Sequence, residues 1–81
     1  MQRNDILNET IEIIRSHFHL KAGEVTENTN FAKDLAGDSL DLVEIVINLE
    51  DHFNLKKIPD ADAEGFQTVK EVVDFIQKNL A

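Results

Sequence analysis

The chain has 81 residues, with 16 Asp or Glu against 8 Lys or Arg, and a formal net charge of −8. This length predicts one small domain over residues 1–81, and the acid excess excludes a nucleic-acid partner and favours basic protein surfaces. Because cysteine is absent, disulfides and thiolate metal sites are excluded. The chain has no apolar run of membrane-spanning length and no signal-peptide pattern at Met1, so we expect a soluble, cytoplasmic protein. We also expect it to be a monomer.

A first helix is predicted from about Asn4 to His17. Apolar residues recur along this segment at spacings of three and four, which is the pattern of one buried helix face. We find no chemical role for this helix in its sequence and interpret it as scaffold. The three histidines of the chain, His17, His19 and His52, are predicted to be solvated surface residues.

The segment Leu20–Gly37 is predicted to be a long irregular connection, because it is rich in turn-forming glycine and asparagine. A loop of this length in a small domain is uncommon unless it is anchored or functional. Its three large apolar side chains are the predicted anchors into the core: Val25, Phe31 and Leu35.

The helix predicted from Ser39 to Phe53 begins at a clear start signal. Asp38 is a good N-cap because its carboxylate can accept hydrogen bonds from the unpaired N–H groups of the first turn. Gly37 supplies a flexible joint before it. Ser39 then falls in the first turn, where the unpaired amides and the helix dipole would both favour a phosphate.

This second long helix carries two apolar stripes when its residues are placed about 100° apart. The first is an ordinary core stripe of Leu42, Ile45, Val46, Leu49 and Phe53. The second lies beside the serine and consists of Leu40, Val43 and Ile47, framed by Asp41, Glu44 and Asp51. Since a surface helix needs only one apolar stripe, the second predicts a surface for partner proteins. A helix buried on two sides is the alternative.

A short helix is predicted near Asp60–Glu64, entered through Pro59 and ended by Gly65. Thr68 then caps a last helix, with Glu71 completing a capping box. The core stripe of that helix is Val69, Val72, Val73, Ile76 and Leu80. Three main helices and one short helix, with a long loop between the first two, make an all-α bundle.

The motif Asp38-Ser39-Leu40-Asp41 resembles that of the acyl carrier proteins, in particular the stand-alone type of fatty-acid synthesis. The resemblance covers nearly the whole chain, through Phe31, Asp34-Leu35, Val43-Glu44, Phe53, Ile58-Pro59-Asp60, Ala63-Glu64 and Thr68-Val69. Two departures stand out. The family usually has glycine directly after the leucine at position 35, whereas this chain has Ala36 and then Gly37. Between Phe53 and Ile58 the chain is one residue longer than the common pattern and carries Lys56-Lys57 where acids are frequent.

The resemblance implies that Ser39 carries a covalent 4′-phosphopantetheine arm, with Asp38 and Leu40 belonging to the attachment motif. A phosphopantetheinyl transferase (holo-carrier synthase) would supply the arm from coenzyme A, and the arm's thiol would hold acyl chains as thioesters. The protein is then a carrier and not an enzyme, and its partners are fatty-acid-synthesis enzymes and acyltransferases with basic surfaces. The candidates for lining an acyl pocket are Leu42, Val46, Phe66 and Val72.

Other functions fit parts of the sequence. The same carrier chemistry occurs in polyketide, nonribosomal peptide and D-alanylation pathways, and Ser39 could also be a helix-start residue in a non-carrier interaction module. The run Gly37-Asp38-Ser39-Leu40 is also a serine-hydrolase signature, but His52 would lie roughly 20 Å away along the same helix. A calcium-loop spacing is present at Asp60, Asp62, Glu64, Gly65 and Glu71. We interpret that run as a short acidic helix followed by a capped helix, with no specific metal site.

Overall fold

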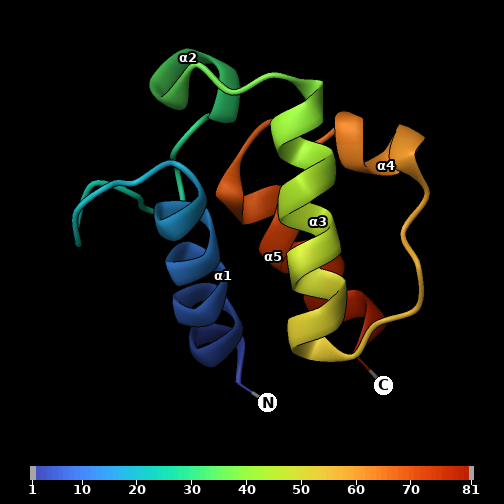
Figure 1. The fold of residues 1–81 in the computed structure, drawn as a ribbon. Coiled ribbons are helices and arrows are strands. Elements are labelled where there is room, and N and C mark those ends of the chain that lie inside the picture. The colour runs from blue at the N-terminus through green and yellow to red at the C-terminus, as the bar shows by residue number, and fades with distance from the viewer. Residues whose placement is uncertain (1, 81) are drawn as a thin grey trace.

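The computed structural model describes residues 2–80, and these form five helices (Figure 1). Three are long: α1 (Arg3–His17), α3 (Ser39–Phe53) and α5 (Val69–Asn79). The other two are single turns, α2 (Phe31–Leu35) and α4 (Asp60–Glu64). Residues 2–80 contain no strand beyond one isolated bridge, between Asn30 and Thr68. The predicted all-α bundle is therefore confirmed. None of the described helices is long and apolar enough to cross a lipid bilayer.

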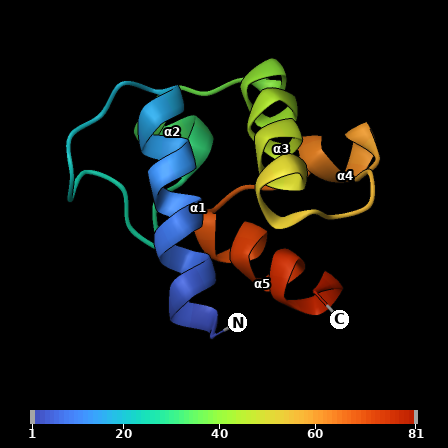
Figure 2. The same cartoon turned by 60° about the horizontal axis from the view of Figure 1, so that its bottom comes forward.

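The three long helices enclose the core. Helices α1 and α3 run side by side in opposite directions, and α5 crosses beneath them (Figures 1 and 2). Helix α1 packs chiefly on α5, and α4 packs on α3. The connection between α1 and α2 loops outward on the side of α1 away from α3, as Figure 2 shows. The start of α3 is thereby left at an open corner of the molecule.

The core fixes how α3 is rotated about its own axis. All five residues of its predicted core stripe are buried. Four of them meet buried aliphatic side chains of α1 and α5, and Val46 packs in a second cluster with Ile58 and Ala63. Each fully buried side chain of this size contributes about 1.5–3 kcal/mol, so another rotation of α3 would be costly. The buried partners on the other two long helices include Ile6, Ile14, Val69, Val72, Val73 and Ile76.

The predicted irregular connection contains a helix that the sequence analysis did not identify. Asn30 begins α2, and its side-chain oxygen accepts hydrogen bonds from the backbone N–H groups of Ala32 and Lys33, at 3.0 and 2.9 Å. The Asp34 carboxylate in turn accepts from the Asn30 N–H at 2.7 Å. The expected loop over Leu20–Gly37 is therefore wrong for Phe31–Leu35, because this reciprocal cap satisfies the amides of a first helical turn. The predicted anchors of this segment do enter the core: Val25 and Phe31 are buried, and Leu35 is half-buried.

The beginning of α5 holds the loop before α2 in place. Backbone hydrogen bonds run from Phe31 N–H to Gln67 O and from Val69 N–H to Thr29 O, at 3.0 and 3.1 Å. Thr68 caps α5 as predicted, accepting from the Glu71 N–H at 3.4 Å. The Glu71 carboxylate, however, accepts from the N–H of Gln67 and not from that of Thr68. The returning bond of the predicted capping box therefore goes to Gln67, one residue before the N-cap. Gln67 is also the residue whose carbonyl accepts from the Phe31 N–H.

Ala36 and Gly37 connect α2 to α3 in an unusual way. Ala36 ends α2 in the left-handed conformation, at φ 52° and ψ 32°, which costs an L-residue about 1–2 kcal/mol. Gly37 is not the flexible joint that we expected. A Cβ atom at this position would lie 3.0 Å from Phe18 Cζ and 3.2 Å from the Phe31 carbonyl oxygen, so glycine is needed here for close packing.

The substitution Ala36→Gly should stabilise the protein. Glycine removes the left-handed penalty but adds about 0.4–1 kcal/mol of unfolded-state entropy, so we expect a net gain of about 0.5–1 kcal/mol in the free energy of unfolding. Urea unfolding followed by circular dichroism measures it. Ala32→Gly is the matched control, because Ala32 lies inside α2 and should lose about 0.5–1 kcal/mol. Destabilisation by both changes would contradict this explanation.

Candidate functional site

Ser39 lies at the corner where the α2–α3 connection becomes a helix. It is the first residue of α3, and it is exposed. A hollow beside it has an apolar wall of Phe31, Leu42 and Phe66, and its charged lining residues are Lys33, Asp38 and Glu64. A helix leaves its first N–H groups without partners inside the helix. An exposed hydroxyl at this helix start, beside an apolar wall, fits a phosphate ester bearing a flexible chain.

The first turn of α3 is closed by a reciprocal cap. Asp38 is the N-cap, as predicted, and its Oδ1 accepts a hydrogen bond from the Asp41 N–H at 3.0 Å. In return, Asp41 Oδ2 accepts from the Asp38 N–H at 2.9 Å. This capping box encloses Ser39 and Leu40. The N-cap was predicted from the sequence but the returning bond was not, because aspartate takes the place at which glutamate or glutamine is usual.

His17 contradicts the expectation of a solvated surface residue, whereas His52 is exposed as expected, although it pairs with a carboxylate. The His17 side chain is only 14% exposed, and its Nε2 lies 2.9 Å from Asp41 Oδ1 and 4.0 Å from a Glu44 carboxylate oxygen. His52 Nε2 lies 2.8 Å from Glu9 Oε1. His19 is exposed. Periodicity could not reveal the two pairs, because each histidine reaches a carboxylate on another helix.

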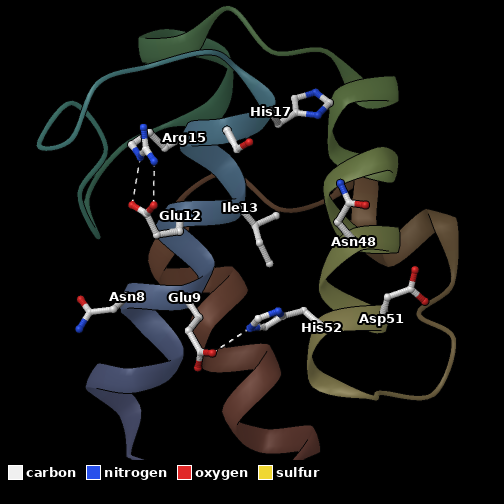
Figure 3. Close-up of a pocket in the computed structure, with 10 residues that line it drawn as sticks. Asn8, Glu9, Glu12, Ile13, Arg15, His17, Asn48, Asp51 and His52 are labelled. Atoms are coloured by element: carbon white, nitrogen blue, oxygen red, sulfur yellow. Dashed lines mark hydrogen bonds and ion pairs between the residues drawn. The ribbon is translucent and has the colours of Figure 1, made fainter.

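These histidines lie at opposite ends of a groove between α1 and α3. Figure 3 shows His52 of α3 reaching across to Glu9 of α1, while His17 points from the end of α1 toward α3. Ile13, Asn48 and Asp51 also line the groove. The two helices are thus joined by a histidine–carboxylate contact near Ser39 and by a second one far from it.

The predicted partner surface on α3 is uneven. Leu40 and Ile47 are the exposed large hydrophobic residues, at 63% and 50%. Val43 is half-buried and packs against a second core cluster that includes Val46 and Ile58. Among the framing acids, Glu44 and Asp51 are exposed, whereas Asp41 turns toward His17 and Asp38. The apolar strip is therefore two exposed side chains with a half-buried one between them.

The four candidates for an acyl pocket are divided between the two core clusters, and the pocket itself stays a prediction. Leu42 and Phe66 both line the hollow beside Ser39. Val46 belongs to the second core cluster and Val72 to the main one. Phe66 packs against both clusters and meets Phe75 edge-on, with ring centroids 5.4 Å apart. Only the first pair is next to the serine.

The structure gives no support, within residues 2–80, to the serine-hydrolase signature or to the calcium-loop spacing. No hydrogen bond joins Ser39 Oγ to a histidine within residues 2–80, and His17 Nε2 is occupied by Asp41. The segment with the calcium-loop spacing begins as α4, with Pro59 as its N-cap. In the described part of the chain, no three histidine or carboxylate side chains are grouped so as to hold a metal ion.

Hydrogen bonding perturbs the acid at the centre of this corner. The hydrogen bond from His17, helped by the backbone N–H of Asp38, holds the pKa of the Asp41 carboxyl below its ordinary value. Since this pKa is lower in the folded protein than in the unfolded chain, the contact contributes stability above the unfolded pKa, near 4. That stability is lost as the pH falls through the folded pKa.

Comparison with known proteins relates nearly the whole chain to one family. A family model described as a phosphopantetheine attachment site matches residues 8–76. The chain is 40% identical to an acyl carrier protein of Lactobacillus acidophilus, over 98% of each chain. It is 38% identical to one of Porphyromonas gingivalis, over 95% of this chain and 97% of that protein. An acyl carrier protein of Prochlorococcus marinus is 42% identical, over 95% of each.

Replacing His17 should release the pKa of Asp41. In His17→Ala we expect this pKa to rise toward the ordinary value near 4, because the hydrogen bond that lowers it most is lost. Side-chain carboxyl NMR signals followed through an acid titration measure it. Asp74 is the internal control, since Lys70 and Arg3 lower its pKa on another face. An unchanged Asp41 pKa would show that the His17 contact does not persist in solution.

Proposed function

The chain belongs to the acyl carrier protein family, whose prosthetic group is 4′-phosphopantetheine, and from this we propose that it carries acyl intermediates of fatty-acid biosynthesis as thioesters on an arm attached to Ser39. One observation carries the assignment of the residue. Ser39 is an exposed serine at the start of a capped helix, whereas Ser16, the other serine, lies within α1.

The surroundings of Ser39 define what this chain contributes to loading of the arm. Ser39 Oγ would attack the pyrophosphate phosphorus of coenzyme A that bears the pantetheine chain, forming a phosphoester and releasing 3′,5′-ADP. No hydrogen bond within residues 2–80 activates the hydroxyl, so the base that takes its proton, and any metal, would belong to the transferase. The chain itself presents the hydroxyl and holds the helix start in place.

The loaded arm supplies a thiol that forms thioesters, which this cysteine-free chain cannot do with its own side chains. The hollow beside Ser39 gives the arm a surface to lie on, with Leu42 and Phe66 as apolar contacts and Lys33 as a cation. An arm tethered there keeps its acyl group at a high effective concentration for each enzyme that docks.

The exposed side of α3 suits a series of short-lived partners. Leu40 and Ile47 offer a small apolar contact, and Glu44 and Asp51 lie exposed on the same helix. A carrier must leave each enzyme quickly. Charged rim residues favour this because they speed and orient the encounter more than they add affinity. We infer that basic surfaces on the transferase and on fatty-acid-synthesis enzymes meet α3 here.

The fatty-acid pathway is the best-supported choice among carrier pathways. The chain aligns with stand-alone proteins named acyl carrier protein over nearly their full lengths, and its charge of −8 matches basic partners. No feature of the described residues favours the polyketide, nonribosomal peptide or D-alanylation alternatives over this one.

Ser39→Ala should abolish loading of the arm while leaving the fold intact, because Ser39 is exposed. The chain is incubated with coenzyme A and a phosphopantetheinyl transferase, and its intact mass is measured. We expect one phosphopantetheine on the wild type and on Ser16→Ala, and none on Ser39→Ala. Modification of Ser39→Ala would overturn the assignment, and an unmodified wild type would overturn the carrier function.

Glu44→Lys should slow association with a basic transferase. The change reverses a charge on the exposed side of α3, so we expect the association rate to fall about three- to tenfold at low salt and to depend less on salt. Stopped-flow binding at several salt concentrations measures this. Glu24→Lys makes the same change in charge on an exposed loop residue and is the matched control. Equal effects from both variants would show that net charge alone is sensed.

A further inference from the structure

The C-terminal end of α1 supports the connection that leads to Ser39. We call His17 and Phe18 the α1 support. The Phe18 ring lies so close to Gly37 that a Cβ there would be 3.0 Å from Phe18 Cζ. The rings of His17 and Phe18 meet edge-on, with centroids 4.9 Å apart and an interplanar angle of 78°. The two neighbouring residues therefore contact positions on both sides of Ser39, at Gly37 and Asp41.

An unbroken series of hydrogen bonds leads from this support to the first turn of α3. His17 Nε2 and Asp41 Oδ1 lie 2.9 Å apart. The other oxygen of the same carboxylate accepts from the Asp38 N–H at 2.9 Å, and the Asp41 N–H donates back to Asp38 at 3.0 Å. Both oxygens of Asp41 are thus used inside the protein. Its carboxylate cannot turn outward to a partner without breaking one of these bonds.

We propose that His17 is a positioning residue for arm transfer: it holds Asp41 in the capping box and so fixes the direction in which Ser39 presents its hydroxyl. This inference rests on the proposed attachment at Ser39. His17 has no hydrogen bond to Ser39 among residues 2–80, so it acts through Asp41 and is not catalytic. A transferase that docks on α3 then meets a serine already oriented by its own protein.

Exposure separates this contact from ordinary surface ion pairs. The His17 and Asp41 side chains are 14% and 32% exposed, so water competes less for their hydrogen bond than at a fully exposed pair. The second bridge between the same helices, His52–Glu9, is 43% and 37% exposed. Figure 3 shows it at the far end of the groove. It ties α1 to α3 without touching the Ser39 corner, which makes it a matched control.

The test compares four variants of the full-length chain as substrates of a phosphopantetheinyl transferase with coenzyme A. His17→Ala and His17→Leu both remove the donor, and the leucine keeps most of the side-chain volume. His17→Gln keeps a side-chain N–H near the position of Nε2. His52→Ala removes the control bridge. Assays are run well below each variant's melting temperature, and kcat and KM for the carrier are measured separately.

We expect both donor-removing variants to lower kcat about tenfold with KM changed less than about twofold, because the docking surface is intact while the reacting hydroxyl is less well oriented. His17→Gln should retain kcat within about twofold, and His52→Ala should behave as the wild type. Equal losses of kcat in His17→Leu and His52→Ala would show that His17 only ties α1 to α3, and would overturn the positioning role. Unchanged kcat in both donor-removing variants would overturn the proposal.

Amide hydrogen exchange provides a readout that does not need the transferase. Exchange at the Asp38 and Asp41 N–H groups should quicken in His17→Ala and His17→Leu, but not in His17→Gln or His52→Ala. Unaltered exchange in the donor-removing variants would overturn the positioning role even if kcat fell. If the wild-type chain took up no arm at all, the proposed function would fail, and the exchange data would still decide whether His17 holds the capping box.

Discussion

Burial of one side of α3 governs both the packing of the long helices and the surface that the molecule exposes. Leu42, Ile45 and Leu49 fill the space between α1 and α5, and close packing lets the helix turn about its axis by very little. Once those three are inside, Leu40 and Ile47 must face solvent. The start of α3 lies at an open corner of the molecule (Figure 1). The core thus decides which surface a partner can meet.

The corner at Ser39 is held by tertiary contacts more than by its own chain. Ala36 occupies a left-handed conformation, which is unfavourable for an L-residue and is sustained by its surroundings. Gly37 fits only because it lacks a side chain against Phe18 and Phe31. An exposed residue that must be recognised by another protein gains from such support, because less ordering remains to be done on binding.

Histidines and backbone amides divide the acids of α3 into two groups. No Lys or Arg occurs between Asp34 and Leu55, so these carboxylates find other partners. Asp41 meets His17, and Glu50 accepts a hydrogen bond from the Ile58 N–H of the loop before α4. Glu44 and Asp51 remain exposed. The acids with internal partners shape the helix start and the loop, and the exposed ones are left to attract basic proteins.

The long helices, the N-cap at Asp38 and the core stripe of α3 could be predicted from the sequence, because each is encoded in residues close together along the chain. The family could be predicted because its motif residues recur in order along nearly the whole chain. The sequence also contained the Asn30 cap of α2, which the turn-forming residues around it obscured. Tertiary packing was needed to show that Asp41 pairs with His17, that Val43 is half-buried and that His17 is largely shielded from solvent. These depend on contacts between residues far apart in sequence, such as His17 and Asp41 at a separation of 24. Local patterns carry no information on which side chains such packing brings together.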